Sequence, residues 1–564
     1  MITASVLILV ALLIAVIMVG IFIRPRRAST LDFYLAGQRV GVVTNACAIC
    51  GDYFSAASFL GVAASVYVSG LDGIWYATGF AAGFVPVLLF VAAPLRRFGE
   101  FSIPDFLGRR LESDRVRFTA VVAVQLIILS YLVPQAVGSG ITWELLVGHG
   151  IAGLSPYATG VVVATTVITA LVTLGGMRGT TWTQAIQFLL LLAAFVWLAI
   201  AVVGSGFHYA DAVADVSAEP LANPVHTGGQ WQLEAEANRL HPGEAIHFGE
   251  PGGRYGPLGQ FALIMTLVMG TAGLPHIMNR YFTSPTGTAA RMTTVWVLGL
   301  AGLFYALAVM LGTAARALIP AAASRHPWLD ELTVDGVLRV PEHALLALGR
   351  LYGGQAGLGF IATGALIAVL STIAGLLLAS AASWGHDVYE RHINPRATQR
   401  QAVWAGRGAV LTVAGLSAAL ALSLRPDSLT AMFPSIVATM VTWAFAFAGS
   451  ALTPVFILTI WWRRMTAAGA VAGIVTGAVT AITMFATGTI AGDRGLGEML
   501  LTPTVVAAPL AAGVAVVISL YTRTPANLER LWLRLHGTAA DRRAERLARL
   551  TISGVADLHS GPQR

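Results

Sequence analysis

The chain has 564 residues, of which 56% are hydrophobic and 11% are charged. A soluble globular chain has roughly 45–50% apolar and 25% charged residues, so this composition excludes a soluble enzyme, a disordered regulator and a DNA-binding module. All 35 basic residues are arginine, and with 28 acidic residues they give a net charge of +7. In so apolar a chain, this excess indicates cytoplasmic loops of a membrane protein rather than a nucleic-acid surface.

The first apolar segment covers residues 2–23 and is followed at once by Arg24-Pro25-Arg26-Arg27. A cleaved signal peptide carries its positive charge before the apolar core, not after it. We therefore expect an uncleaved membrane span whose N-terminus lies outside the cell.

Further apolar runs follow, each near the roughly 20 residues that a helix needs to cross a membrane. They lie at 43–68, 73–95, 117–147, 156–174, 181–203, 257–279, 292–319, 354–384, 405–424, 429–460, 466–489 and 503–521. The sequence thus predicts an all-α polytopic membrane protein of about thirteen spans, with a cytoplasmic C-terminus. Under this topology 27 of the 35 arginines lie on the cytoplasmic side, as the positive-inside rule requires.

Two loops on the predicted outer side, 204–256 and 320–342, are long and acidic. The C-terminal tail instead carries arginines among bulky apolar residues, a pattern typical of an amphipathic helix on the inner leaflet. These tail residues are Leu531, Trp532, Leu535, Arg542, Arg543, Arg546, Leu547, Arg549 and Leu550.

Polar and irregular stretches inside membrane spans are the candidate functional regions, because unpaired backbone in hydrocarbon costs several kcal/mol. In 45–61, Gly51, Asp52, Ser55 and Ser58 stand at mid-span. They fit a broken helix that frees carbonyls for a cation; the alternative is a kinked helix bonded to a neighbour. Asp52 must be partnered, near water or protonated.

Two later segments have the same character. In 269–280, Gly270, Gly273 and Pro275 loosen the helix. His276 with Arg280 could reach toward a carboxylate, or His276 could be a satisfied packing residue. We expect Arg280 to be only the inner end-anchor of this span. In 363–375, the adjacent hydroxyls of Ser371-Thr372 could help to bind a small cation or could bond to the preceding turn.

The sequence lacks the motifs of soluble catalysis, such as Walker A, H-E-x-x-H and G-x-S-x-G. The two cysteines, Cys47 and Cys50, have no second pair to complete a metal site, and we interpret them as packing side chains. We therefore predict neither an enzyme nor an ATP-driven pump.

Four motifs make the chain recognisable. They are Gly51-Asp52-Tyr53-Phe54-Ser55-Ala56-Ala57-Ser58-Phe59-Leu60-Gly61, Gly175-Gly176-Met177-Arg178-Gly179-Thr180-Thr181-Trp182-Thr183-Gln184, Gly270-Thr271-Ala272-Gly273-Leu274-Pro275-His276 followed by Arg280-Tyr281-Phe282-Thr283, and Ser371-Thr372. Over roughly residues 30–470 the chain resembles the sodium:solute symporter family, and within it the branch of cation/acetate symporters and monocarboxylate transporters.

The resemblance implies a leucine-transporter-like core of five plus five helices in inverted repeat. On this basis we expect the chain to be divided into an extra helix and loop at 1–40, the first repeat at 41–203, an extracellular loop at 204–256, the second repeat at 257–460, two further spans at 461–521 and a basic cytoplasmic tail at 522–564.

The resemblance also implies site residues. Carried over by motif, the Na⁺ ligands fall on Gly51, Phe54, Ala368, Ser371 and Thr372. The substrate-binding candidates are Tyr53, Ser55, Ser58, Thr271, Gly273, His276 and Trp443. Many relatives carry an acidic residue where this chain has Gln184, and H⁺ therefore remains the alternative coupling ion. Asp52 and Gln184 are the candidates for a cation or proton path.

These features predict a secondary active symporter in the cytoplasmic membrane of a prokaryote, coupling Na⁺ influx to uptake of acetate or another short monocarboxylate by alternating access. The alternatives are another solute, such as proline, pantothenate or a sugar, and a sensor that does not transport. The expected partners are the solute and the lipid bilayer, without nucleic acid, and we expect a monomer to suffice for transport.

Overall fold

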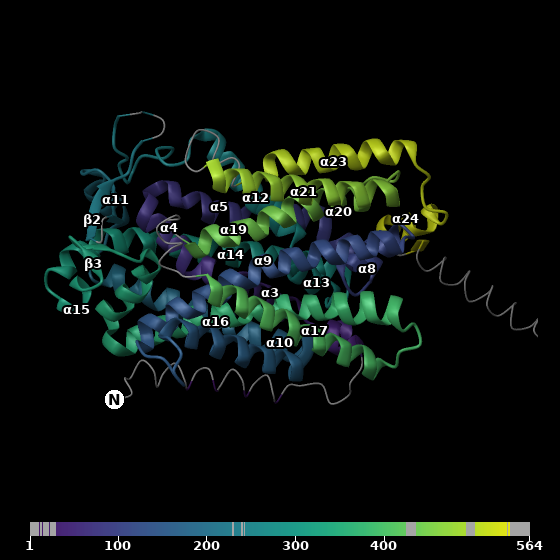
Figure 1. The fold of residues 1–564 in the computed structure, drawn as a ribbon, viewed down its shortest axis with the longest axis horizontal. Coiled ribbons are helices and arrows are strands. Elements are labelled where there is room, and N and C mark those ends of the chain that lie inside the picture. The colour runs from purple at the N-terminus through teal and green to yellow at the C-terminus, as the bar shows by residue number, and fades with distance from the viewer. Residues whose placement is uncertain are drawn as a thin grey trace, which may run out of the picture.

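The structure is a computed structural model that describes residues 30–541 apart from 228–229, 239–240, 242, 425–435, 492–501 and 539, together with positions 11, 14, 18 and 22. Its long helices run side by side along the long axis of the molecule (Figure 1). Apart from those four positions, the span predicted at 2–23 lies outside the described residues, and so does the arginine-rich tail segment from Arg542 onward.

Helices dominate the first half of the chain. Their bounds are α2 Thr30–Leu35, α3 Val42–Tyr53, α4 Val62–Ser69, α5 Ile74–Ala82, α6 Phe84–Pro86, α7 Ala92–Phe98, α8 Ile103–Arg110, α9 Asp114–Val147 and α10 Pro156–Gly204. Short 3₁₀ or π segments cover Ala36–Gln38 (η1), Ala57–Gly61 (η2), Gly70–Gly73 (η3) and Val87–Val91 (η4).

The second half follows the same pattern, with two small hairpins in its loops. Its elements are α11 Tyr209–Ser217, β1 Ala222–Thr227, β2 Gln230–Ala235, α12 Pro257–Gly273, α13 Pro275–Phe282, α14 Gly287–Ala323, α15 Pro327–Asp330, β3 Thr333–Val334, β4 Val337–Leu338, η5 Pro341–His343, α16 Ala344–Ala382, η6 Ser383–Ile393, α17 Gln399–Ser423, α19 Ile436–Phe447, η7 Ala448–Leu452, α20 Thr453–Trp461, α21 Ala467–Ala491, α23 Thr504–Tyr521 and α24 Leu528–His536.

Several helices begin where a hydroxyl side chain accepts a hydrogen bond from a backbone N–H of the first turn, the usual N-terminal cap. Ser113, Ser155 and Thr286 cap α9, α10 and α14 in this way. Thr398 begins α17 with a reciprocal bond to Gln401. The sequence therefore sets the beginnings of these helices locally.

In the described part of the chain, nine helices are long and apolar enough to cross a membrane, or ten with the bent pair α12–α13. The number is smaller than the predicted thirteen partly because two stretches each join two predicted spans. Ala57–Phe98 joins the end of 43–68 to 73–95, and Pro156–Gly204 joins 156–174 to 181–203. Gly176, with φ 56° and ψ −164°, breaks α10 between the two spans predicted there.

The two ends of the bundle differ in character (Figure 1). The end with α11, α15 and the two hairpins, here called the loop end, holds much of 204–256. Asp72 anchors that loop, because its buried carboxylate accepts hydrogen bonds from the backbone N–H groups of Gly252 (2.6 Å) and Arg254 (2.8 Å).

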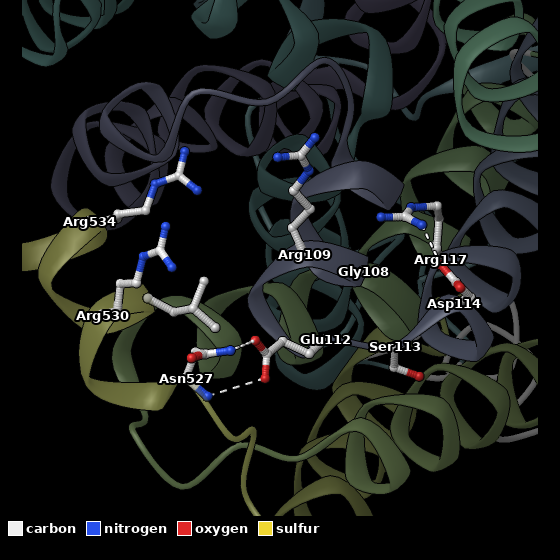
Figure 2. Close-up of a pocket in the computed structure, with 10 residues that line it drawn as sticks. Gly108, Arg109, Glu112, Ser113, Asp114, Arg117, Asn527, Arg530 and Arg534 are labelled. Carbon is white, nitrogen blue, oxygen red and sulfur yellow. Dashed lines mark hydrogen bonds and ion pairs between the residues drawn. The ribbon is translucent and has the colours of Figure 1, made fainter. Parts of the chain in front are cut away.

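The opposite end, with α8 and α24, is here called the arginine-rich end. Leu531 and Leu535 of α24 are buried against the protein, so the part of the tail that the structure describes packs on the bundle with its leucines. Asn527 donates to Glu112 (2.6 Å), and a cavity of about 350 Å³ opens beside this contact (Figure 2). Its lining residues include Arg109, Arg117, Arg530 and Arg534.

Candidate functional site

Helix α3 breaks at the motif that the sequence singled out. It ends at Tyr53, Phe54 has the non-helical dihedrals φ −78° and ψ 81°, and helical structure resumes at Ala57. Tyr53, Phe54 and Ser55 are at most 1% exposed, so this irregular backbone lies inside the protein. Of the two interpretations left open by the sequence, the structure therefore has the broken helix.

A second break separates α12 from α13, which bend by 41° at Leu274. Pro275 begins α13, where its missing N–H removes no helical hydrogen bond. At Gly273 an added Cβ would collide with Thr453 Oγ1 and with the carbonyl oxygen of Ala448 (2.7 Å), so glycine is what allows this close approach. The structure confirms an irregular helix at the predicted Gly270–Pro275 stretch.

The two breaks meet through side chains. Tyr53 Oη lies 2.7 Å from Thr271 Oγ1 and donates to the carbonyl oxygen of Phe80 at 3.0 Å. An added Cβ at Gly83 would collide with Thr271, so Gly83 makes room for this contact. Tyr53 and Thr271, two of the predicted substrate residues, are thus in direct contact.

The predicted Na⁺ ligands on α16 lie against the end of α3. Ser371 Oγ donates to the carbonyl oxygens of Gly51 and, at 3.0 Å, of Ala368. Thr372 Oγ1 donates to the carbonyl oxygen of Asp52 at 2.8 Å, whereas the carried-over carbonyl ligands from this stretch are Gly51 and Phe54. The structure brings Gly51, Ala368, Ser371 and Thr372 together and adds the Asp52 carbonyl, which the sequence did not single out.

Beside this group lies a buried ion pair. Arg280 Nε is 3.2 Å from Asp52 Oδ2, and both side chains are at most 1% exposed. The expectation that Arg280 is an end-anchor is therefore wrong, because its guanidinium points into the protein and finds its counter-ion there. Asp52 is a partnered carboxylate, one of the states expected for a charge within a span.

The guanidinium of Arg280 has two further acceptors on α10. It donates to Thr181 Oγ1 at 2.7 Å and to Gln184 Oε1. Gln184 in turn donates through Nε2 to the carbonyl oxygen of Ser371 at 2.6 Å. Asp52, Thr181, Gln184 and Arg280 form one hydrogen-bonded group, here called the ion-pair cluster, and Gln184 joins it to the predicted Na⁺ ligands.

The remaining predicted substrate residues occupy varied positions. Ser58 Oγ is 2.9 Å from Tyr305 Oη, and Ser55 is buried directly after the break. His276 is 2% exposed, and neither of its ring nitrogens has a hydrogen-bond partner among the described residues. Trp443 packs against Phe485 of α21, with 5.8 Å between ring centroids.

The sequence analysis missed three kinds of contributor. The ring of Phe445 of α19 lies 6.0 Å from that of Tyr53, and the ring of Tyr131 of α9 lies 5.5 Å from that of His276. Both residues therefore contact predicted substrate residues. Gly375 lies so close to the Asp52 carboxylate that an added Cβ would collide with both oxygens. The spacing of residues in the sequence could not indicate them, because each contacts a site residue on a different helix.

Two broken helices that face each other around buried hydroxyls, freed carbonyls and an ion pair define a class of protein, the secondary transporters of small solutes. The comparisons with known proteins agree. A profile of the sodium:solute symporter family matches residues 33–477, and the chain therefore belongs to that family.

One relative is the uncharacterized symporter YwcA of Bacillus subtilis (strain 168), 31% identical over 464 residues, which cover 82% of each chain. Among solved structures, a Na⁺-coupled sialic acid symporter in a substrate-bound outward-open state has a TM-score of 0.70 at 16% identity, covering 92% of this chain and 98% of that one. Mhp1, a nucleobase-cation-symport-1 transporter, has a TM-score of 0.51 at 13% identity, covering 89% and 98%. These likenesses concern the fold.

Proposed function

We propose that this protein is a symporter that couples Na⁺ influx to the uptake of acetate or a similarly short monocarboxylate across the cytoplasmic membrane of a prokaryote. Membership of the sodium:solute symporter family supports Na⁺-coupled solute symport. The observation that carries the proposal is the contact of the Ser371 and Thr372 hydroxyls with the carbonyls at the broken end of α3.

The Na⁺ site in this proposal uses oxygen atoms alone, which hard cations prefer. Its ligands are the hydroxyls of Ser371 and Thr372 with the carbonyl oxygens of Gly51, Phe54 and Ala368. Two of these carbonyls already accept hydrogen bonds from Ser371. Rotating the hydroxyl hydrogens away turns the same oxygens into ligands, so Na⁺ binding replaces hydrogen bonds that now join α3 to α16.

The carboxylate of the solute would lie between the two breaks. Helix N-termini attract anions because their first backbone N–H groups are unpaired and the helix dipole is positive there. Chain segments at both breaks, after Ser55 and after Leu274, begin new helical structure. Tyr53, Ser55, Ser58, Thr271, Gly273 and His276 surround this region, and Trp443 is proposed as a more peripheral contact.

Charge considerations bear on the stoichiometry. One Na⁺ moving with one monovalent anion carries no net charge, whereas a second cation would add about 2.3 kcal/mol of driving force per 100 mV. The proposed ligands form one cation site, and the Arg280 charge is paired with Asp52. We therefore propose a 1:1 stoichiometry.

Uptake of radiolabelled acetate into proteoliposomes tests the proposal. The vesicles are given an inward Na⁺ gradient, a pH gradient or neither, and contain either the unmodified protein or Ser371→Ala/Thr372→Ala. The control Ser417→Ala/Thr459→Ala removes a buried serine and a buried threonine hydroxyl that bond within their own helices.

We expect uptake that requires Na⁺, falls at least tenfold in the first double variant and persists in the control. Uptake driven by the pH gradient alone would overturn the Na⁺ assignment. No acetate uptake under any gradient would overturn the solute assignment, and proline, pantothenate and sugars would be tested next.

A further inference from the structure

At the arginine-rich end, helix α8 packs against η6, the continuation of α16, through polar side chains. Asp105 of α8 and His386 and Asp387 of η6 are 0%, 4% and 0% exposed. Each offers one potential ligand atom, and these three atoms lie within 4.8 Å of one another. No part of the proposed transport site uses these residues.

Two of the atoms at the centre of this group lack hydrogen-bond partners. Within the described part of the chain, Asp387 Oδ1 has no hydrogen-bond partner; His386 Nε2 has none either, and it lies 3.5 Å from Asp105 Oδ2 as an ion pair. A buried polar atom without a partner costs about 1–3 kcal/mol, and more when it is charged. The structure therefore leaves Asp387 Oδ1, and His386 Nε2 beside the Asp105 carboxylate, available to a further binding partner.

The other oxygen or nitrogen of each of these three side chains, in contrast, contacts a neighbouring side chain. Ser102 Oγ donates to Asp387 Oδ2 at 2.6 Å, and His386 Nδ1 lies 2.8 Å from Glu390 Oε2. Asp105 Oδ1 lies 3.5 Å from an Arg117 nitrogen. A carboxylate on Nδ1 keeps a hydrogen on that nitrogen, so a metal would bind at Nε2, in place of the ion pair with Asp105.

We propose that Asp105, His386 and Asp387 form a binding site for a divalent transition-metal cation of the Zn²⁺ class, with water as a further ligand. One imidazole nitrogen and two carboxylate oxygens suit such an ion. Tetrahedral Zn²⁺ keeps its ligand atoms about 3.3 Å apart. The 3.5 Å between His386 Nε2 and Asp105 Oδ2 is close to this value, and a small rotation brings in Asp387.

The bound cation would tie the segment that leads into α9 to the helix that carries Ser371 and Thr372. Glu390, which contacts His386, has a side chain that is 34% exposed, so the group lies close to the protein surface. Arg109 and Arg117 of the cavity in Figure 2 face the outer side of Asp105 and offset part of its charge. The metal would therefore stabilise the contact between α8 and η6 at one end of the transport core, outside the transport site.

The test is metal binding by the full-length protein purified in detergent and stripped with a chelator. Zn²⁺ is titrated by calorimetry, retained metal is counted after desalting, and Co²⁺ is added separately to record its visible absorption. We expect one Zn²⁺ per chain, a higher unfolding temperature with Zn²⁺, and a Co²⁺ band typical of a nitrogen–oxygen site.

Ligand and second-sphere variants sharpen the test. His386→Gln and Asp387→Asn should each lower Zn²⁺ affinity at least a hundredfold and remove the Co²⁺ band, and Glu390→Gln should lower affinity about 10–100-fold. The control is His536→Gln, a histidine at the same end that contacts the carbonyl oxygen of Ile460; it should bind Zn²⁺ unchanged.

Two results would overturn the proposal. One is an unmodified protein that neither retains Zn²⁺ nor changes its unfolding temperature when Zn²⁺ is added, which would leave His386 as an ion-paired histidine. The other is equal Zn²⁺ binding by the unmodified protein and by His386→Gln. The unfolding temperature of each metal-free variant shows that it is folded, so a loss of binding is not a loss of structure.

Discussion

At the scale of single residues, the ion pair between Asp52 and Arg280 is the least expected feature of the molecule. Sequence patterns located both residues in irregular spans, but 228 positions separate them, and no local pattern joins them. A buried charge whose partner is removed costs about 3–5 kcal/mol, whereas removing both charges costs far less. The pairing is thus a property of the fold rather than of either motif.

The difference between removing one charge of the pair and removing both gives a testable prediction. Asp52→Asn and Arg280→Gln should each lower the free energy of unfolding by about 3–5 kcal/mol, because each leaves one buried charge unpaired. The double variant should lose less than the sum of the two. Thermal unfolding in detergent measures all three, and strictly additive losses would show that the pair is not coupled.

Gly375 gives a second prediction at this scale. Gly375→Ala should destabilise the protein and displace the Asp52 carboxylate, because the new Cβ would collide with it. The matched control is Gly408→Ala on α17, where an added Cβ meets nothing within 4 Å. Alanine favours a helix by about 1 kcal/mol over glycine, so the control should be neutral or stabilising. Equal unfolding temperatures for the two variants would contradict the argument.

At the scale of elements, local chemistry indicated where the helices would be irregular. Glycine and proline at 270–275 loosen a helix, and the polar residues from Gly51 onward fitted a broken or a kinked helix; the structure has a break at both places. The docking of α24 was not predictable in the same way. Its periodicity fits a membrane surface as well as a protein surface, and the choice depends on the partner that the fold supplies for Leu531 and Leu535.

The anchoring of the outer loop by Asp72 gives a prediction for an element. In addition to Gly252 and Arg254, Trp75 donates to this carboxylate through Nε1 at 3.2 Å. Asp72→Asn halves its acceptor capacity and removes its charge, and charge-assisted hydrogen bonds contribute about 1.5–3 kcal/mol. We expect proteases to cleave 204–256 at least tenfold faster in this variant.

The control for this experiment is Asp211→Asn, an exposed carboxylate of α11. It should leave the cleavage rate unchanged, because no anchoring bond is lost. If both variants were cleaved at the rate of the unmodified protein, Asp72 would not hold the loop.

At the scale of the whole molecule, composition alone indicated a helical membrane protein, and the similarity of the fold to solved symporters agrees. The positions of most spans followed from apolar length. The joining of 156–174 to 181–203 did not follow, because helical structure continues on either side of Gly176, where φ is 56°. A break of this kind depends on one residue, whereas the apolar pattern averages over a whole span.

The unequal ends of the bundle predict its orientation in the membrane. If the arginine-rich end faces the cytoplasm, Arg325→Cys at the loop end should react with a membrane-impermeant maleimide in intact cells. Arg400→Cys should react only after permeabilisation. The native cysteines, Cys47 and Cys50, are buried and should give no background. The reverse labelling pattern would invert the predicted topology.

The hydrogen bonds around Arg280 have a mechanical consequence. From Asp52 on α3 they pass to Arg280 on α13, to Gln184 on α10, to Ser371 on α16 and back to Gly51 on α3. The circuit closes on itself across four helices that lie far apart in the sequence. Sliding any one of these helices past its neighbours must open the circuit at two joints. A movement of one of these four helices along its axis is therefore coupled to the positions of the other three, because it must break two of these contacts.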